Sequence, residues 1–277
     1  MTKIPLIIGE DSPFLTTETR QSRWAIPYNL ECLNARIDNL LTRNQHFVKG
    51  KRVLDIGSHI GTFMYSALDL GAKFVQGIDT EAKTIERGQT LFRQLEVDES
   101  LYDLQVHDAY CYLENLEKGS FDTVLCLGTL YYMVEPYRLL QLIQKVAKET
   151  IIIDTFTAAY AAIQGKEAPV VYRAINEESL KLSMLLTALT QPGKKDYRLP
   201  HSFLHRNKNL SLITLPTDTL LKTWFQSSGM SYTKISWEQY QTRPCTYHDL
   251  VTPEQKKSSH WADVYTSGVR VSYLLSK

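Results

Sequence analysis

The chain has 277 residues, with 31 Lys and Arg against 30 Asp and Glu, and it is 43% hydrophobic and 22% charged. This is the composition of a globular protein, and the length accommodates one core with an appended insertion. The balanced charge argues against a general nucleic-acid binder, because phosphate affinity requires concentrated Lys and Arg. The apolar runs are far shorter than the roughly 20 residues of a membrane span. We therefore expect no membrane partner.

The cysteines give no sign of a metal framework. Cys32, Cys111, Cys126 and Cys245 are scattered without a CxxC pair, and isolated thiols of this kind fit a reducing compartment. The first ten residues lack the pattern of a secretion signal. We expect a cytoplasmic protein without a bound metal.

The first 155 residues predict a cap followed by an alternating core. Apolar residues at helical spacing over residues 16–48, among them Trp24 and Tyr28, predict one amphipathic helix. From Arg52 onward, short β-type runs alternate with helical stretches. The predicted strands are residues 52–56, 74–78, 104–106, 121–127 and 151–153. This alternation predicts an α/β protein with a parallel sheet.

After Asp154 the alternation stops. Residues 155–209 hold one predicted helix, 177–189, and a polar loop, 191–209, which is typical of a lid or substrate insertion. Thr217 has the chemistry of a helix N-cap, and strands are predicted at residues 232–236 and 269–275. We divide the chain into an N-terminal helical cap (1–47), a core (48–155), a lid or substrate insertion (156–216) and a return to the core (217–277).

The most informative motif is the turn that follows the first predicted strand, VLDIGSHIG at residues 53–61. Gly57 and Gly61 remove Cβ atoms where a ligand lies against the backbone, and the following helix start supplies amide donors. The spacing is GxxxG, whereas nicotinamide enzymes carry GxGxxG. Asp55 would repel a pyrophosphate but suits an ammonium group, and Asp79 at the end of the second strand suits ribose hydroxyls. Together they predict a site for an amino-acid nucleoside.

Residues 49–155 resemble the class I S-adenosylmethionine-dependent methyltransferases, whose first motif has this form. The resemblance implies a Rossmann-like, mostly parallel sheet with an antiparallel last strand, and S-adenosylmethionine as cofactor. It places Asp55 and the glycine turn at the methionine moiety, Asp79 at the ribose, Asp108 at the adenine, and the end of strand four at the transferable methyl. The cofactor-binding residues that it implies are Asp55, Gly57, Ser58, Gly61, Asp79, Thr80, Asp108, Ala109, Leu127 and Gly128.

A second resemblance is to the tRNA wobble-uridine 5-oxyacetate synthases, which use carboxy-S-adenosylmethionine. It rests on residues 126–131, the end of strand two, the region of Trp24, and residues 209–229. The chain departs from that branch in carrying Tyr132 where a histidine is usual and in having a shorter N-terminal region. The extra carboxylate needs a cationic clamp, for which Arg270 is the candidate. We predict plain S-adenosylmethionine as the cofactor and keep the carboxylated form as the alternative.

Catalysis is predicted to need positioning more than a covalent nucleophile, because methyl transfer is an in-line displacement. Tyr131 and Tyr132, next to the methyl by family position, are the catalytic candidates. Asp154 lacks a neighbouring Asp or Asn that would complete a metal's oxygen shell. The candidate substrate-binding residues are Tyr28, His201, His205 and Arg270, and the loop at 191–209 adds Lys194, Lys195, Arg198, Arg206 and Lys208.

Three functions are compatible with these residues. We favour a methyltransferase that acts on an oxygen or nitrogen of a small-molecule acceptor. The alternatives are a tRNA wobble-uridine methyl or carboxymethyl transferase, and a catalytically inactive cofactor-binding partner subunit. The sequence leaves the oligomeric state open, a homo-oligomer included.

Overall fold

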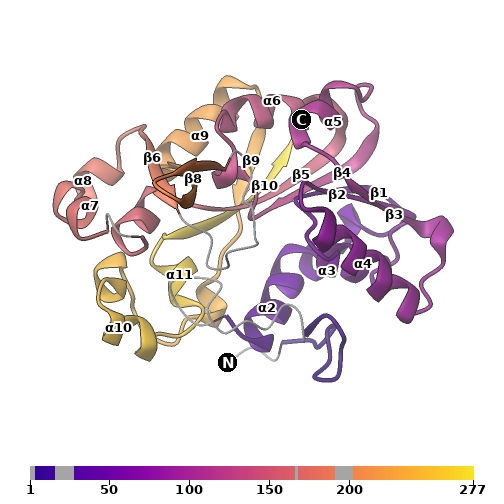
Figure 1. Cartoon of the computed structure of the whole chain (residues 1–277), viewed down its shortest axis with the longest axis horizontal. Helices are drawn as coiled ribbons and strands as arrows, with labels where there is room; N and C mark the ends of the chain where they lie inside the picture. The colour runs from indigo at the N-terminus through magenta and orange to yellow at the C-terminus, as the bar shows by residue number, and fades with distance from the viewer. Residues whose placement is uncertain (1–3, 16–27, 166–167, 191–201) are drawn as a thin grey trace.

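The computed structural model describes residues 4–15, 28–165, 168–190 and 202–277 (Figure 1). Its centre is a sheet of seven strands in the order β3-β2-β1-β4-β5-β10-β9. The strands are β1 (Arg52–Ile56), β2 (Phe74–Asp79), β3 (Tyr102–Val106), β4 (Phe121–Leu127), β5 (Ala147–Phe156), β9 (Ser231–Lys234) and β10 (Arg270–Ser276). Strands β1 to β5 pair in parallel, and β10 runs antiparallel to β5 and β9. The predicted α/β sheet with an antiparallel last strand is confirmed.

Helices cover both faces of this sheet, because successive strand residues point to opposite sides. The helices are α2 (Leu30–Leu40), α3 (Thr62–Asp69), α4 (Ala82–Gln94), α5 (Ala109–Glu114), α6 (Pro136–Val146) and α9 (Asp218–Ser227). Val53 of β1 belongs to the hydrophobic cluster beneath α2, α3 and α4, and Leu54 belongs to the cluster beneath α5, α6 and α9. Thr217 caps α9 as predicted, its hydroxyl accepting from the amide of Leu220.

The N-terminal helix is shorter than the sequence pattern predicts. Asn29 caps α2 at its start, and the helix ends at Leu40, where a 3₁₀ segment, η1 (Thr42–Phe47), follows. The predicted helix also covered Trp24, which lies outside the described residues. Between residues 28 and 47 the cap therefore consists of two consecutive short helical segments.

The predicted helix at residues 177–189 is wrong. After η4 (Ala158–Ala162) and α7 (Ala168–Ala174), helix α8 (Glu177–Leu180) makes a single turn, and the chain then forms strand β6 (Leu185–Thr190). Strand β6 pairs with β8 (Lys208–Pro216), which also pairs with β7 (Phe203–His205). Pairing with a distant strand decided the conformation of β6, since its short apolar run suits a helix or a strand equally well.

A second set of short helices lies between β9 and β10. It contains η5 (Glu238–Tyr240), η6 (Tyr247–Leu250), α10 (Pro253–Ser258) and α11 (Asp263–Thr266). Tyr240 donates a hydrogen bond to Asp38 of α2 at 2.7 Å, and Trp237 stacks on Tyr265 at 3.7 Å. This segment therefore packs against the cap helix beside the carboxyl end of β5 (Figure 1). Within the described ranges, no helix is long and apolar enough to cross a membrane.

Candidate active site

The glycine turn between β1 and α3 lies at the centre of the parallel strands, where ligands bind in doubly wound sheets. Gly57 and Gly61 have φ of +71° and +83°. A Cβ on Gly57 would lie 2.1 Å from Thr129 Oγ1, and one on Gly61 would lie 2.7 Å from the ring of Phe92. Both positions therefore require glycine, but the atoms that a Cβ would meet belong to the protein's own side chains and not to a ligand, which was the reason expected from the sequence. Ser58 between them is buried.

Two amides of the turn itself are bound within the protein. Those of Gly57 and Ser58 both donate to the carbonyl of Ile78, at 2.8 and 3.0 Å. The turn is thereby fixed to the end of β2. The sequence predicts ligand donors at the following helix start, and Phe63 and Met64 of α3 stand in a first turn, where amides have no acceptor in the preceding helix.

Three aspartates stand at the carboxyl ends of neighbouring strands. Asp55 is in β1, Asp79 ends β2, and Asp108 follows β3. Asp79 accepts hydrogen bonds from the amides of His59 (3.1 Å) and Glu81 (3.0 Å), and Asp108 accepts from Cys111 at the start of α5 (3.0 Å). The backbone thus holds the carboxylates of Asp79 and Asp108 in place along one edge of the sheet.

The residues that follow Asp79 and Asp108 in the chain differ in exposure. Thr80 is exposed next to Asp79, and Ala109 is buried next to Asp108. Both follow a strand end, as predicted, so a ligand lying across β2 and β3 would meet a hydroxyl at one position and an apolar wall at the other.

Asp55 is the most perturbed of the three carboxyl groups. Burial, together with repulsion from Asp79, raises its pKa to about 7, and Arg36 opposes this effect. A buried carboxyl group with a raised pKa becomes ionised when a cation binds beside it. Asp55 therefore suits an ammonium or sulfonium ligand.

The end of β4 is crowded by two polar side chains. Gly128 has φ of +95°, and a Cβ there would lie 3.1 Å from a terminal nitrogen of Arg270 and 3.8 Å from the hydroxyl of Tyr131. Tyr131 is buried, whereas Tyr132 and Leu127 are half-buried, and the two tyrosine rings lie 4.3 Å apart. Gly128 thus leaves room for a guanidinium and a phenol to converge beside the strand end.

Behind Gly128 lies a buried ionic cluster formed by Arg36, Asp154 and Arg270. Asp154 accepts from Arg36 at 2.7 Å and from two nitrogens of Arg270 at 2.8 and 3.0 Å. Although burial raises the pKa of Asp154, the two guanidinium groups outweigh it and hold that pKa below its ordinary value. Two guanidinium groups thus bind one carboxylate. No pattern in the sequence predicted a role for Arg36, because its partner Asp154 is 118 residues away.

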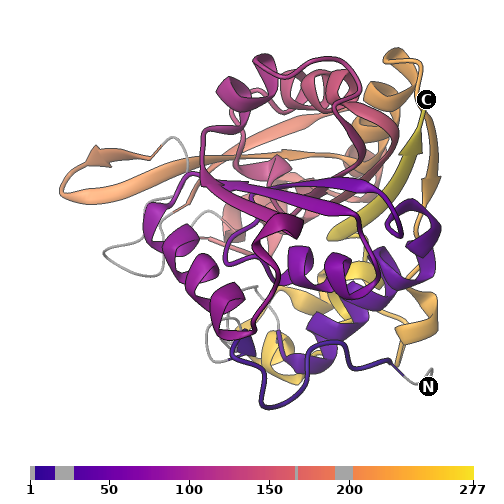
Figure 2. The same ribbon diagram turned by 90° about the vertical axis from the view of Figure 1, so that its right-hand side faces the viewer.

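The candidate substrate residues separate into two groups. Tyr28 accepts from Arg36 at 3.2 Å and Arg270 is almost fully buried, so both belong to the ionic cluster. Arg270 binds Asp154 in the interior, so it does not offer the exposed guanidinium that a substrate-binding residue implies. His205 is exposed in β7 and pairs with Lys208, on a hairpin that projects from the body (Figure 2). His201 lies outside the described residues, as do Lys194, Lys195 and Arg198.

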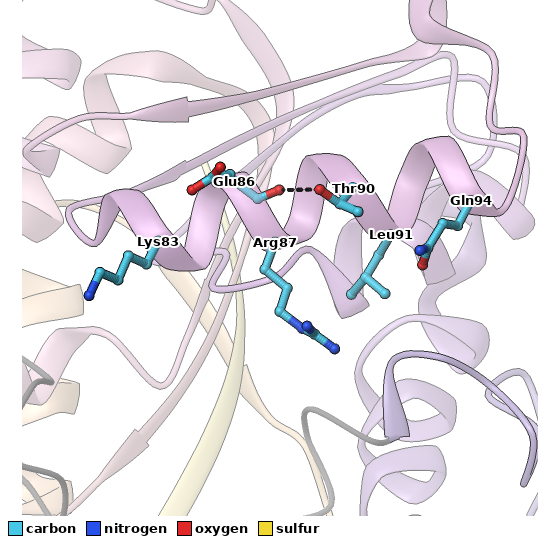
Figure 3. Close-up of a pocket in the computed structure, with 6 residues that line it drawn as sticks. All are labelled: Lys83, Glu86, Arg87, Thr90, Leu91 and Gln94. Atoms are coloured by element: carbon cyan, nitrogen blue, oxygen red, sulfur yellow. Dashed lines mark hydrogen bonds between the residues drawn. The ribbon is translucent and has the colours of Figure 1, made fainter.

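A pocket of about 230 Å³ on α4 is separate from the strand ends (Figure 3). Its lining comes from that helix alone: Lys83, Glu86, Arg87, Thr90, Leu91 and Gln94. None of the three aspartates contributes to it. In the part of the chain that the structure describes, no group of three His, Cys, Asp or Glu side chains could hold a metal ion.

Known proteins resemble this chain at the level of family and fold. A family model described as a methyltransferase domain matches residues 47–199. A tRNA U34 carboxymethyltransferase of Sulfurimonas denitrificans is 25% identical over 230 residues, which are 81% of this chain and 60% of that protein. A ubiquinone biosynthesis O-methyltransferase of Neisseria meningitidis is 31% identical over 100 residues, 36% of this chain and 40% of that protein.

The solved structures agree on the fold. An S-adenosylmethionine-dependent methyltransferase from Mesorhizobium loti superposes with a TM-score of 0.53 at 16% identity, over 88% of this chain and 98% of that one. The chain spans 60% or less of the curated relatives described above. The family model covers more than half of the chain. The chain therefore belongs to the methyltransferase domain family.

Proposed function

We propose that this protein transfers the methyl group of S-adenosylmethionine to an oxygen or nitrogen of a small-molecule acceptor. The observation that carries the proposal is the row of Asp55, Asp79 and Asp108 at the ends of adjacent strands around a turn that only glycine allows. An amino-acid nucleoside offers an ammonium group, ribose hydroxyls and an adenine amino group, all of which donate hydrogen bonds to carboxylates. The order of the three aspartates on the adjacent strands β1, β2 and β3 supports this order of contacts.

Each part of the site has one role in the proposed reaction. Asp55, Gly57, Ser58 and Gly61 bind the methionine moiety, with Asp55 ionised by the ammonium group. Asp79 and Thr80 bind the ribose, and Asp108 and Ala109 hold the adenine. Leu127 and Gly128 leave the space beside the transferable methyl, where S-adenosylmethionine supplies the electrophilic carbon.

Tyr131 and Tyr132 act on the acceptor. Displacement at the methyl carbon requires the incoming atom roughly 3 to 3.5 Å away and in line with the leaving sulfur. The hydroxyl of Tyr131 lies beside Gly128 and orients that atom, while the half-buried Tyr132 closes the site from the solvent side.

The experiment is calorimetric titration of S-adenosylmethionine into the wild-type protein and into Asp79→Ala. We expect the Kd to rise by at least about tenfold, the effect of losing one charged hydrogen-bond acceptor. Asp69→Ala, an exposed aspartate at the end of α3, is the matched control and should bind normally. Equal affinities of all three proteins would refute the assignment of Asp79 to the ribose.

A second candidate is carboxymethyl transfer to a tRNA uridine. It is favoured by the position of Arg270, a terminal nitrogen of which lies 3.1 Å from where a Cβ on Gly128 would stand, beside the proposed place of the transferred carbon. A carboxylate on the transferred carbon would be attracted to a guanidinium at that position. The names of several relatives, tRNA U34 carboxymethyltransferases, support the same candidate.

Competition calorimetry separates the two candidates without any mutation. Tighter binding of S-adenosylmethionine than of its carboxylated form supports methyl transfer. The reverse preference, together with tRNA affinity that falls steeply as salt is added, replaces it with carboxymethyl transfer. Binding of the cofactor without turnover of any acceptor would favour the inactive partner-subunit alternative, and a protein that binds neither compound would contradict all three functions.

A further inference from the structure

The strands β6, β7 and β8 form an arm that projects from the body of the molecule (Figure 2). We use "arm" for residues 185–190 and 203–216. Strand β8 has nine residues, which corresponds to a length of about 27 Å. Its base is anchored beside the candidate active site, because Thr214 donates to the carbonyl of Met133 at 2.7 Å.

One face of the arm is apolar and open. The register pairs Leu189 with Leu212 and Phe203 with Leu210, so these side chains share a face with Leu185. Leu185, Leu189 and Phe203 are each about two-fifths exposed. Thr187 and Thr214 face each other on the same side, between Leu185 and the pair of Leu189 with Leu212. Exposed apolar side chains gathered on one face mark protein contacts.

The base of this face continues into a groove of about 460 Å³. Leu185 belongs to both, and the rest of the apolar lining comes from Val134, Pro136, Tyr137 and Trp224. The rings of Tyr137 and Trp224 lie 5.7 Å apart and form one wall. A single chain thus presents a projecting apolar face and, at its foot, an apolar groove.

Charge at the two ends of the arm is complementary. The tip carries the exposed side chains of His205, Arg206 and Lys208, and residues 202–216 include no Asp or Glu. The groove rim carries Glu135 and, beyond it, Glu114, whose half-exposed carboxylates both bind Arg138. Two carboxylates share one cation there, so the rim is negative where the tip is positive.

The tip also stores backbone strain. Arg206 and Asn207 form the two-residue turn of the hairpin, with φ of +47° and +59°. Such turns favour Asn-Gly, and a long side chain in the left-handed region costs about 1 kcal/mol or more. Strain held at one position suggests that the side chain of Arg206 has a use there.

We propose that a second copy of this chain docks on the arm about a two-fold axis. The axis passes near Leu189 and Leu212, and the apolar faces of the two arms lie against each other. Because a two-fold contact is self-complementary, the tip of each arm then lies over the groove of the other. Phe203 of one copy meets the groove wall of its partner, and the basic tip meets the acidic rim.

Sedimentation equilibrium of the full chain tests the proposal. We expect a species of twice the 31.8 kDa chain mass at concentrations of about 10 µM, where a micromolar Kd populates the dimer. Phe203→Glu should raise that Kd at least about tenfold, since a charge would be buried against the groove. Leu204→Glu is the matched control: it is the next residue, more exposed and on the opposite face, and it should dimerise like the wild type.

A charge exchange tests the orientation of the two arms. Glu135→Lys and Arg206→Glu should each weaken dimerisation, and the double variant should recover it, because the reversed charges again face each other. A monomer at every concentration up to about 100 µM would overturn the proposal, as would equal effects of the substitutions at Phe203 and Leu204. A monomer that binds a single-stranded oligoribonucleotide through Phe203 would overturn it too, and would assign the arm to nucleic acid.

Discussion

The buried aspartate of β1 makes a quantitative prediction about stability. The pKa of Asp55 is raised from its ordinary value of 3.8 to about 7, chiefly by burial. This change corresponds to a cost of ionisation in the folded state of up to about 4 kcal/mol. Asp55→Asn removes the ionisation while keeping the shape. We therefore expect the variant to be more stable than the wild type by as much as a few kcal/mol at pH 8.

The pH dependence follows from the direction of the pKa change. Above pH 7 the carboxyl group is ionised in both the folded and the unfolded states, so the folded state bears the full cost. As the pH falls through 7 toward 3.8, the folded state takes up the proton first and the cost disappears. The advantage of Asp55→Asn should thus be largest at pH 8 and close to zero near pH 4.

The assay is urea unfolding of both proteins at pH 8, 6.5 and 5, with stability differences compared so that other titrating groups cancel. Asp154→Asn is the matched control, because Asp154 is equally buried but its pKa is lowered by Arg270 and Arg36. It should lose about 3 to 5 kcal/mol at pH 8, the cost of breaking a buried ion pair. An Asp55→Asn protein that is less stable than the wild type at pH 8 would refute the argument.

Two further substitutions test the backbone. Gly128→Ala should lower stability by more than the roughly 1 kcal/mol of left-handed strain and weaken cofactor binding in calorimetry, because its Cβ would crowd Arg270. The control is Gly229→Ala, at φ of +70° with open space around it, which should cost the strain alone. Equal losses of stability at the two sites would contradict this reasoning. Glu96→Gly should raise the free energy of unfolding by about 1 kcal/mol, and with it the urea midpoint, since Glu96 has φ of +52° just past the end of α4. A lower midpoint would show that the Glu96 side chain contributes more than the strain costs.

The sequence alone determined the positions of the strands of the central sheet. Each buried strand is a short apolar run that ends in a turn, a local pattern that needs no distant partner to be recognised. The glycine turn was equally local, because positive φ at Gly57 and Gly61 restricts the residue type at those positions. Asp55 and Asp79 were predicted from their positions in the chain and Asp108 from the family resemblance, and all three lie at the carboxyl ends of neighbouring strands.

Only the tertiary structure decided the remaining features, because their partners are far apart in the chain. Strand β6 was predicted as a helix, since an apolar run such as residues 185–190 becomes a strand only when β8 pairs with it. The helices between β9 and β10 pack on a cap more than 190 residues away, as the contact of Tyr240 with Asp38 illustrates. Arg36 and Asp154 are ordinary charged residues in the sequence. Only the fold buries them together with Arg270, so that both guanidinium groups bind the carboxylate of Asp154 behind the site.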